Sequence, residues 1–110
     1  MGDAAGSVCA QLQVEVVGNG PPLVLLHGWA MHGGIFAPLV DALREQRTLH
    51  VVDLPGHGNN RDCGVPLELD ACARAVLNAV PDAPWCGWSL GGLIALHAAS
   101  KHPERIPALA

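Results

Sequence analysis

The sequence predicts an α/β fold with a mainly parallel sheet and helices on both faces. Short apolar segments of strand length alternate along the chain with longer segments of helical periodicity, and this alternation is typical of parallel sheets. Of the 110 residues, 50% are hydrophobic and 15% are charged, a composition that can bury a core and is not that of a disordered chain. The apolar runs are short and interrupted by Gly or Pro, so no membrane span is expected.

The first part of the chain predicts a tail, a strand, a turn and a second strand. Residues 1–10 lack the basic start and apolar core of a secretory signal, and we expect a loose amino-terminal tail there. Polar and apolar residues alternate over 11–17, which is typical of a strand with one exposed face. The Gly and Pro residues of 18–22 predict a turn. The uninterrupted apolar run at 23–26 predicts a strand buried on both faces.

The middle of the chain alternates helix and strand. Apolar residues at helical spacing predict a helix over 35–44. A second buried strand is expected over 48–52, and it ends at a turn rich in Gly and Pro. Pro66 can open a helix that runs to about residue 80, since proline fits the first turn of a helix. The apolar run at 85–88 predicts a third buried strand.

The last segments predict a helix over 90–101 and the beginning of another strand over 106–110. The helix is expected to end before Pro103, because the residue before a proline disfavours helical backbone. Crossovers between parallel strands are right-handed in nearly all cases, so the direction of each step along the sheet decides which face a helix covers. A reversal after the strand at 48–52 would place the first helix on one face and the next two on the other. It would also open a crevice at the carboxyl ends of the strands.

The sequence permits this reversal, and one motif favours it. Gly87-Trp88-Ser89-Leu90-Gly91 matches G-x-S-x-G, the nucleophile elbow between a strand and a helix. We expect positive φ at Ser89, and glycine two residues before and two after it, because side chains there would clash with the tight turn. The turn exposes the hydroxyl at the amino terminus of a helix. Ser89 is therefore the candidate catalytic nucleophile, with Gly87 and Gly91 as supporting glycines; the alternative is a serine that only caps the helix.

A second segment can supply donors for the oxygen that becomes negative during acyl transfer. In this architecture one donor is the backbone N–H after the nucleophile, here that of Leu90, and the other comes from the loop after an earlier strand. His27-Gly28-Trp29-Ala30 follows the strand at 23–26, so Trp29 is the candidate for the second donor and Gly28 is expected to support it. The Trp29 ring can pack in the core or line an acyl pocket.

Several function classes are excluded by charge and spacing. A net charge of −4 argues against nucleic-acid binding, which needs clustered positive charge. Arg61 stands where a dinucleotide fingerprint needs its third glycine, and Lys101 lies in no phosphate-binding loop. The histidines lack the spacing of a zinc site, so neither a metal nor a cofactor is expected. The cysteines show no paired short spacing, which favours a reduced, cytoplasmic protein.

No histidine of this sequence is expected to act as the base for Ser89. His27 belongs to the oxyanion loop, His57 to a loop after a strand, His50 to a buried strand, and His97 lies two turns into a helix. Asp53, at a strand end, is expected to be a turn residue. In one well-studied serine protease, loss of the base costs about a millionfold in kcat, so a serine without its base is a weak nucleophile.

Four segments, at 23–29, 52–58, 87–93 and 102–106, carry a resemblance to a known family. From Leu23 onward the chain resembles the amino-terminal part of the α/β-hydrolase fold family, and these motifs are similar to those of carboxylesterases of biotin biosynthesis. The resemblance implies hydrolysis of a carboxylic ester through an acyl-enzyme on Ser89. It also implies contacts of Trp29 and Leu90 with the substrate, which is either a small-molecule ester or the methyl ester of an acyl chain on a carrier protein.

The resemblance also implies what this sequence does not contain. The family's acid and base follow the serine in chain order. Neither of them falls within the sequence, and neither does the lid that meets the carrier protein. In addition, Asn60 stands where the family often has a serine after the Gly-His-Gly turn. We therefore expect residues 11–110 to be the amino-terminal part of one domain, with exposed apolar surface, poor solubility and little activity alone. The open alternatives are an acyltransferase, lyase or haloperoxidase on the same scaffold, or a non-catalytic truncated product.

Overall fold

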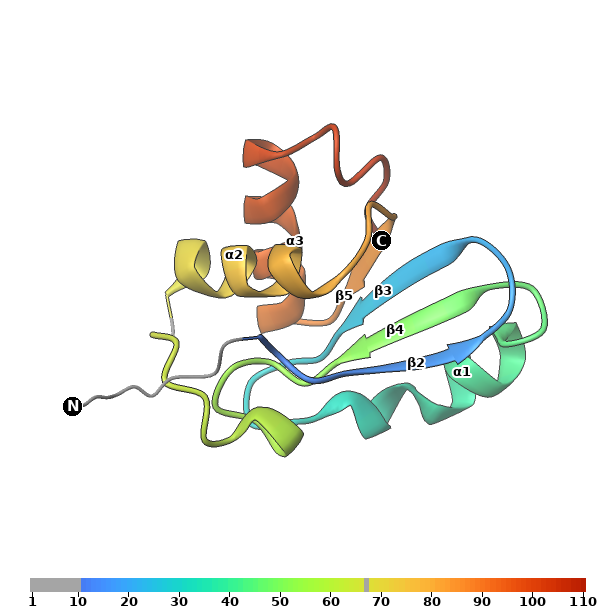
Figure 1. The fold of residues 1–110 in the computed structure, drawn as a ribbon, viewed down its shortest axis with the longest axis horizontal. Coiled ribbons are helices and arrows are strands. Elements are labelled where there is room, and N and C mark those ends of the chain that lie inside the picture. Colours follow the sequence, from blue (N-terminus) through green and yellow to red (C-terminus); the bar gives the residue numbers. More distant parts are fainter. Residues whose placement is uncertain (1–10, 67) are drawn as a thin grey trace.

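The computed structural model describes residues 11–66 and 68–110, and the tail expected at 1–10 lies outside them. Among these residues the chain forms a four-stranded sheet with helices on both faces (Figure 1). The strands are β2 (Val14–Gly18), β3 (Pro22–Leu26), β4 (Thr48–Val52) and β5 (Trp85–Gly87). The helices are η1 (Gly33–Phe36), α1 (Ala37–Leu43), η2 (Gly58–Asn60), α2 (Leu69–Ala79) and α3 (Leu90–Lys101).

The strand order β2-β4-β3-β5 confirms the expected reversal. β3 pairs in parallel with β4 on one side and with β5 on the other, while β2 is antiparallel to β4. The chain therefore steps from β3 to β4 and then returns past β3 to reach β5. This change of direction places a crevice at the carboxyl ends of β3 and β5, and it confirms the predicted α/β class with a mainly parallel sheet.

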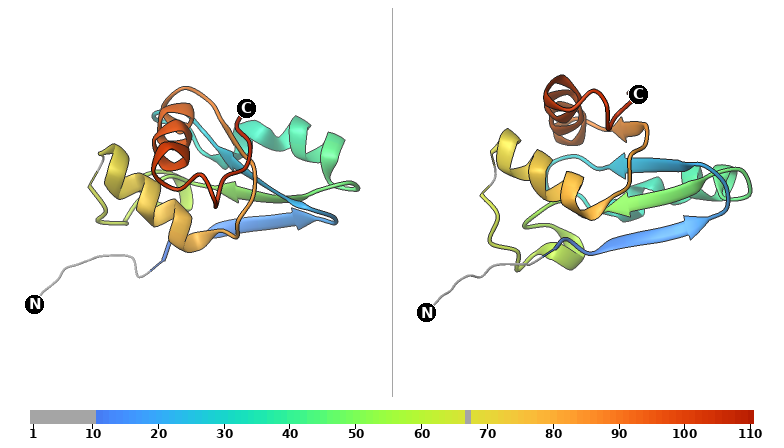
Figure 2. Two further views of the ribbon diagram at one scale, coloured as in Figure 1. Left: turned by 90° about the horizontal axis from the view of Figure 1, so that it is seen from above. Right: turned by 45° about the horizontal axis from the view of Figure 1, so that its top comes forward.

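The two faces of the sheet carry separate cores, as the reversal requires. Val24 and Leu26 of β3 face α2 and α3, whereas Leu25 faces η1 and α1, because successive side chains of a strand point to opposite faces. Figures 1 and 2 show α2 and α3 on one side of the sheet and α1 on the other. The α1 face is less completely covered: α1 has no buried residue, and its Leu39, Val40 and Leu43 are only partly buried.

Several element boundaries differ from the expected ones for local reasons. The strand expected at 11–17 begins at Val14, because the backbone of Gln13 bonds to the Asn60 side chain instead. The helix expected at 35–44 is split into η1 and α1, with proline at the second position of α1, where its missing N–H costs no helical bond. The helix expected at 66–80 starts at Leu69, since Glu68 is still extended.

The strand start expected at 106–110 appears as a short parallel pairing beside β5. The Trp85 N–H donates to Ala108 O at 3.0 Å, and the Gly87 N–H donates to Ala110 O at 3.0 Å. The pairing is one isolated bridge between Trp85 and Leu109. Beyond it, the far side of residues 108–110 is an open edge in the described part of the chain.

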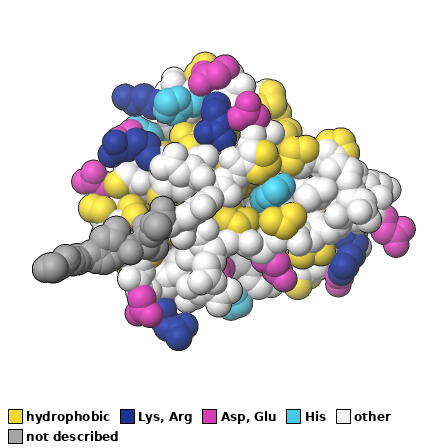
Figure 3. Space-filling view, in the orientation of Figure 1, with side chains coloured by type: hydrophobic (Ala, Val, Ile, Leu, Met, Phe, Trp, Pro, Cys, Tyr) yellow, Lys and Arg dark blue, Asp and Glu magenta, His cyan; other side chains and the backbone are white. Residues whose placement is uncertain are grey.

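Apolar side chains reach the surface in several places, as expected. Trp29, Trp88, Leu93 and Leu96 are each more than half exposed. Figure 3 shows hydrophobic side chains on the surface in separate groups between polar and charged ones. Within the described ranges, no helix combines the length and apolar character needed to cross a bilayer.

Candidate active site

Ser89 occupies a sharp turn between β5 and α3. Its φ is 55° and its ψ is −115°, a region that costs a non-glycine residue roughly 1–3 kcal/mol. Neighbouring hydrogen bonds hold the turn: the Trp88 N–H donates to Leu26 O at 2.9 Å, and the Gly91 N–H donates to Trp88 O at 3.0 Å. Ser89 is exposed, so its hydroxyl stands clear of the sheet at the amino terminus of α3.

Close backbone contacts explain the glycines on either side of Ser89. A Cβ at Gly91 would lie 2.3 Å from Leu26 O, and a Cβ at Gly87 would lie 2.5 Å from the Gly91 carbonyl. Neither backbone neighbour can move without disturbing the strand or the helix. Gly92, next in the chain, is less restricted: a Cβ there would lie 3.3 Å from Gly87 O, which is tight but needs a shift of only a few tenths of an ångström. The turn therefore requires glycine at both positions of the motif.

The loop that follows β3 lies against this turn. A Cβ at Gly28 would meet Ser89 Cβ at 3.2 Å and Trp88 Cδ1 at 3.1 Å. The loop closes as a turn in which the Met31 N–H donates to Gly28 O at 3.2 Å. In the described part of the chain the backbone N–H groups of Trp29 and Leu90 have no hydrogen-bond partner. Both groups therefore remain able to bind an oxygen.

Two apolar cavities lie beside the Ser89 turn. Trp29 and Leu90 share a cavity of about 310 Å³ with residues at the start of α2 and in α3, among them Leu69, Leu93 and Ile94. A second cavity, of about 330 Å³, is lined by Met31, Ile35, Phe36 and Trp88. These cavities suit aliphatic groups on either side of the serine.

His27 is buried and holds the loop after β3 to the loop after β4. The Leu54 N–H donates to His27 Nε2 at 2.9 Å, so Nε2 carries no proton and Nδ1–H donates to Gly28 O at 2.7 Å. Burial is the main cause that lowers the pKa of His27. The ring is therefore neutral near pH 7 and both its nitrogens are occupied.

His57 is engaged in the same way. It is buried, its Nε2 accepts the Ala30 N–H at 2.9 Å, and its Nδ1 lies 3.0 Å from Pro55 O. Elsewhere, His97 bonds Asp70 at 3.2 Å on the α2–α3 surface. None of the described histidines makes a hydrogen bond to Ser89, and each of these three has another partner.

Asp53 and Asn60 organise the loop after β4. Asp53 accepts the Gly33 N–H at 2.6 Å and the Asn59 N–H at 2.8 Å, which is the role of a turn residue. Asn60 is buried; its side chain donates to Asp53 O at 2.6 Å and bonds the backbone of Gln13. No local pattern indicated this role, because Asn60 and Gln13 are far apart along the chain.

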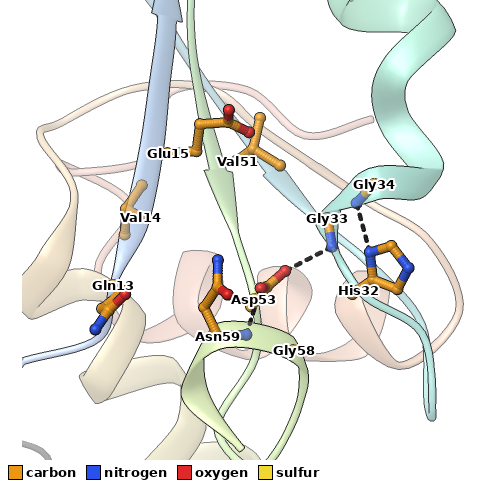
Figure 4. Close-up of a pocket in the computed structure, with 10 residues that line it drawn as sticks. All are labelled: Gln13, Val14, Glu15, His32, Gly33, Gly34, Val51, Asp53, Gly58 and Asn59. Carbon is orange, nitrogen blue, oxygen red and sulfur yellow. Dashed lines mark hydrogen bonds between the residues drawn. The ribbon is translucent and has the colours of Figure 1, made fainter.

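Asp53 also lines a polar cavity of about 380 Å³ (Figure 4). Glu15 of β2 and His32, before η1, also line it, whereas Ser89, Trp29 and Leu90 do not. His32 accepts the Gly34 N–H at 3.0 Å, and both Asp53 oxygens are occupied. Among the described residues, no group of three or more His, Cys, Asp or Glu side chains is arranged to bind a metal ion.

The cysteines depart in part from the expected reduced state. Cys72 and Cys86 carry free thiols, and burial raises the pKa of both. Cys63 is disulfide-bonded. The spacing of the cysteines along the chain does not indicate that bond.

Comparisons with known proteins agree with this geometry. A family model described as alpha/beta hydrolase fold matches residues 21–110. The chain is 59% identical over 93 residues to the pimeloyl-[acyl-carrier protein] methyl ester esterase of Stenotrophomonas maltophilia (strain R551-3), covering 84% of this chain and 36% of that protein. The protein of the same name from Xanthomonas campestris pv. campestris (strain B100) is 56% identical, with 84% and 37% covered.

The structural comparison gives the same architecture. An esterase from Exiguobacterium antarcticum superposes with a TM-score of 0.77 at 29% identity, over 89% of this chain and 39% of that one. The chain thus spans little more than a third of the length of the curated relatives that it matches.

Proposed function

The chain belongs to the alpha/beta hydrolase fold family, and from this premise we propose that it carries the nucleophile and the oxyanion donors of a serine carboxylesterase. The observation that supports this most strongly is the exposed, strained turn at Ser89, beside two backbone N–H groups without partners. The supporting glycines are Gly28, Gly87 and Gly91, whose missing side chains let the two loops meet.

The proposed reaction has two steps. Ser89 Oγ gives its proton to a base and bonds to the carbonyl carbon of the ester. The carbonyl oxygen becomes negative and accepts hydrogen bonds from the N–H groups of Trp29 and Leu90. The carbon–oxygen bond to the leaving group then breaks, and the leaving alcohol takes the proton back from the base. Water next hydrolyses the acyl-enzyme, which releases the carboxylic acid and restores the Ser89 hydroxyl. Each oxyanion donor is worth about 3 kcal/mol in the transition state, and the amino terminus of α3 adds a smaller favourable field.

The base is the part of the machinery that the described residues do not supply. In this family the acid and the histidine follow the serine in chain order, and the described histidines have other hydrogen-bond partners or no contact with Ser89. We therefore propose that the 110-residue chain alone is nearly inactive. An external base such as imidazole should replace part of the missing function.

The apolar cavity and the relatives support a proposal for the substrate class. The cavity beside Trp29 and Leu90 suits an aliphatic acyl chain. The relatives are named for action on the methyl ester of pimeloyl-acyl-carrier protein. We propose the same substrate for the complete protein, with the carrier protein as its partner and cytoplasmic biotin synthesis as its setting.

Hydrolysis of p-nitrophenyl hexanoate with added imidazole tests the proposal. The rate above the imidazole background should be about tenfold or more greater for the wild-type chain than for Ser89→Ala, since only the former has a nucleophile. Ser100→Ala is the matched control: this exposed serine bonds His97 O at 2.7 Å and should not change the rate. Equal rates for wild type and Ser89→Ala would contradict the proposal.

A further inference from the structure

His57 has a fixed tautomer, and its Nε2 lone pair accepts a hydrogen bond from the loop that carries Trp29. Its Nδ1 lies 3.0 Å from Pro55 O, so Nδ1 carries the proton and donates. Its Nε2 is left as an acceptor, and the Ala30 N–H donates to it at 2.9 Å. The ring is only 8% exposed, so water does not readily compete for this bond.

The residue that His57 holds has a strained backbone. Gly28 to Met31 form a turn closed by the Met31 N–H and Gly28 O, and Ala30, at its third position, has a φ of 62°. A turn with positive φ at its third residue and not at its second is a type II turn, which normally has glycine at the third position. A type I turn has φ of about −90° at that position and suits alanine. The bond to His57 is the visible interaction that favours the type II form.

His57 also contacts the side chain of Trp29. The Trp29 and His57 rings meet edge to face with centroids 5.5 Å apart, and the His27 ring also lies near His57, with a centroid distance of 5.1 Å. One imidazole thus contacts both central residues of the turn. The Gly28 end of the same turn lies so close to Ser89 that a Cβ at Gly28 would be 3.2 Å from Ser89 Cβ.

We propose that His57 is a positioning residue of the oxyanion loop: by accepting the Ala30 N–H it keeps the Gly28–Met31 turn in its type II form and so keeps the Trp29 N–H beside Ser89. The inference rests on the proposed function. His57 does not touch the substrate and moves no proton in it. Without the acceptor, Ala30 relaxes toward negative φ and the loop leaves its place beside the serine.

Two substitutions separate the acceptor from the ring. His57→Phe keeps an aromatic ring against Trp29 and His27 but removes the acceptor, whereas the side-chain carbonyl of His57→Gln can accept the Ala30 N–H. The probe is hexylboronic acid: Ser89 Oγ bonds to boron, the serine proton goes to solvent, and the anionic tetrahedral boronate presents a hydroxyl oxygen to the donors. Its dissociation constant is measured by titration followed by NMR on the 110-residue chain.

We expect His57→Phe to weaken Ser89-dependent binding about tenfold or more, a fraction of the effect of losing an oxyanion donor outright. His57→Gln should bind within about threefold of wild type by the same reasoning. Wild-type affinity in His57→Phe would overturn the inference, and so would equal weakening by both variants. If wild type shows no binding that Ser89→Ala abolishes, the proposed function itself fails, and the inference with it.

A second measurement does not depend on the folding of a variant. In the wild-type chain, a nitrogen–nitrogen NMR coupling across the hydrogen bond should connect the Ala30 amide with His57 Nε2. Its presence, with Nε2 unprotonated, supports the positioning role. An Ala30 amide without this coupling would overturn it.

Discussion

At the scale of single residues, the Ser89 turn depends on close backbone contacts that only glycine permits. A Cβ at Gly91 would lie 2.3 Å from Leu26 O and 2.5 Å from His27 O, whereas a Cβ at Gly92 would have no contact under 3.3 Å. Both glycines belong to α3. Adjacent positions of one helix therefore have opposite tolerance for a side chain.

Gly91→Ala should lower the free energy of unfolding by about 3 kcal/mol, because the clash is with backbone that cannot yield. In Gly92→Ala, the better helix propensity of alanine, worth about 1 kcal/mol, offsets a mild contact. The two variants are compared by urea denaturation. Similar losses for both would show that the close approach of α3 to β3 is not the cause.

The buried His27 makes stability depend on pH. Burial lowers the pKa of His27 in the folded chain, while the unfolded chain binds a proton near pH 6.5. As pH falls below about 6.5 the unfolded state takes up a proton that the folded state refuses, so the free energy of unfolding decreases. His50, whose pKa burial also lowers, acts in the same direction.

Urea denaturation at pH 7.5 and pH 5.5 should therefore give lower stability at the lower pH. The loss from His27 is up to about 1.4 kcal/mol for each pH unit over which only the unfolded state binds its proton. An NMR titration should show His27 protonating below its ordinary range. Asp70, whose pKa is lowered chiefly by its bond to His97, titrates outside this window. Constant or rising stability toward pH 5.5 would contradict the buried neutral ring.

The G-x-S-x-G spacing was enough to predict the strained turn at Ser89, because that constraint is local. The roles of His57 and Asn60 were not predictable in this way. Their partners Ala30 and Gln13 lie 27 and 47 residues away along the chain. Only the folded sheet brings these residues together, and no spacing rule records the contact.

At the scale of elements, Arg105 closes the carboxyl end of α2. Its guanidinium donates to Val80 O at 2.8 Å and to Leu77 O at 3.1 Å, carbonyls that a helix end leaves without internal partners. It also pairs with Asp82. This cluster fixes the segment after α3 against the end of α2.

Arg105→Met should lower the free energy of unfolding by about 2 kcal/mol, since hydrogen bonds from a charged group are worth about 1.5–3 kcal/mol. Arg74→Met is the matched control, because Arg74 pairs with Asp70 in the open at 3.1 Å and such pairs contribute about 0.5 kcal/mol or less. Thermal and urea unfolding of both variants measure the difference. A loss no larger for Arg105 than for Arg74 would contradict the capping role.

Element boundaries were predictable where a local signal stops the chain. The helix expected at 90–101 matches α3, because the Ser89 turn starts it and Pro103 follows its end. The strand at 48–52 matches β4. The start of β2 was not predictable, since the Asn60 side chain takes the backbone groups of Gln13.

At the scale of the whole molecule, α3 is apolar on all sides although only one side is covered. Ile94, Ala95 and Ala98 are buried, while Leu93 and Leu96 are 55% and 59% exposed. A helix that is apolar all round normally lies inside a larger fold. The chain spans 36% of the length of one curated relative, which agrees with an incomplete cover.

Leu96→Lys should reduce self-association and binding of a hydrophobic dye, and leave the free energy of unfolding within about 0.5 kcal/mol, because the side chain packs little. Val16→Lys adds the same charge at another exposed position, on β2, and should have a smaller effect. Light scattering and dye fluorescence measure the change. If Val16→Lys had the larger effect, the outer strand β2 would be the self-associating surface instead of α3.

The order of strands is the feature of the whole fold that one motif anticipated. The G-x-S-x-G motif favours a sheet whose direction reverses after the strand at 48–52, and the observed order β2-β4-β3-β5 has that reversal. The incomplete cover of the α1 face follows from the same topology. The disulfide at Cys63 has no such origin, because cysteine spacing does not determine which thiols meet.

The most direct test of the Ser89 assignment is peptide mapping after reaction with a fluorophosphonate probe in the presence of imidazole. The sequence contains three serines, Ser7, Ser89 and Ser100, so the unmodified residues serve as internal controls. The geometry predicts phosphonylation at Ser89 and its loss in Ser89→Ala. Equal modification of Ser100, or undiminished labelling of Ser89→Ala, would contradict it.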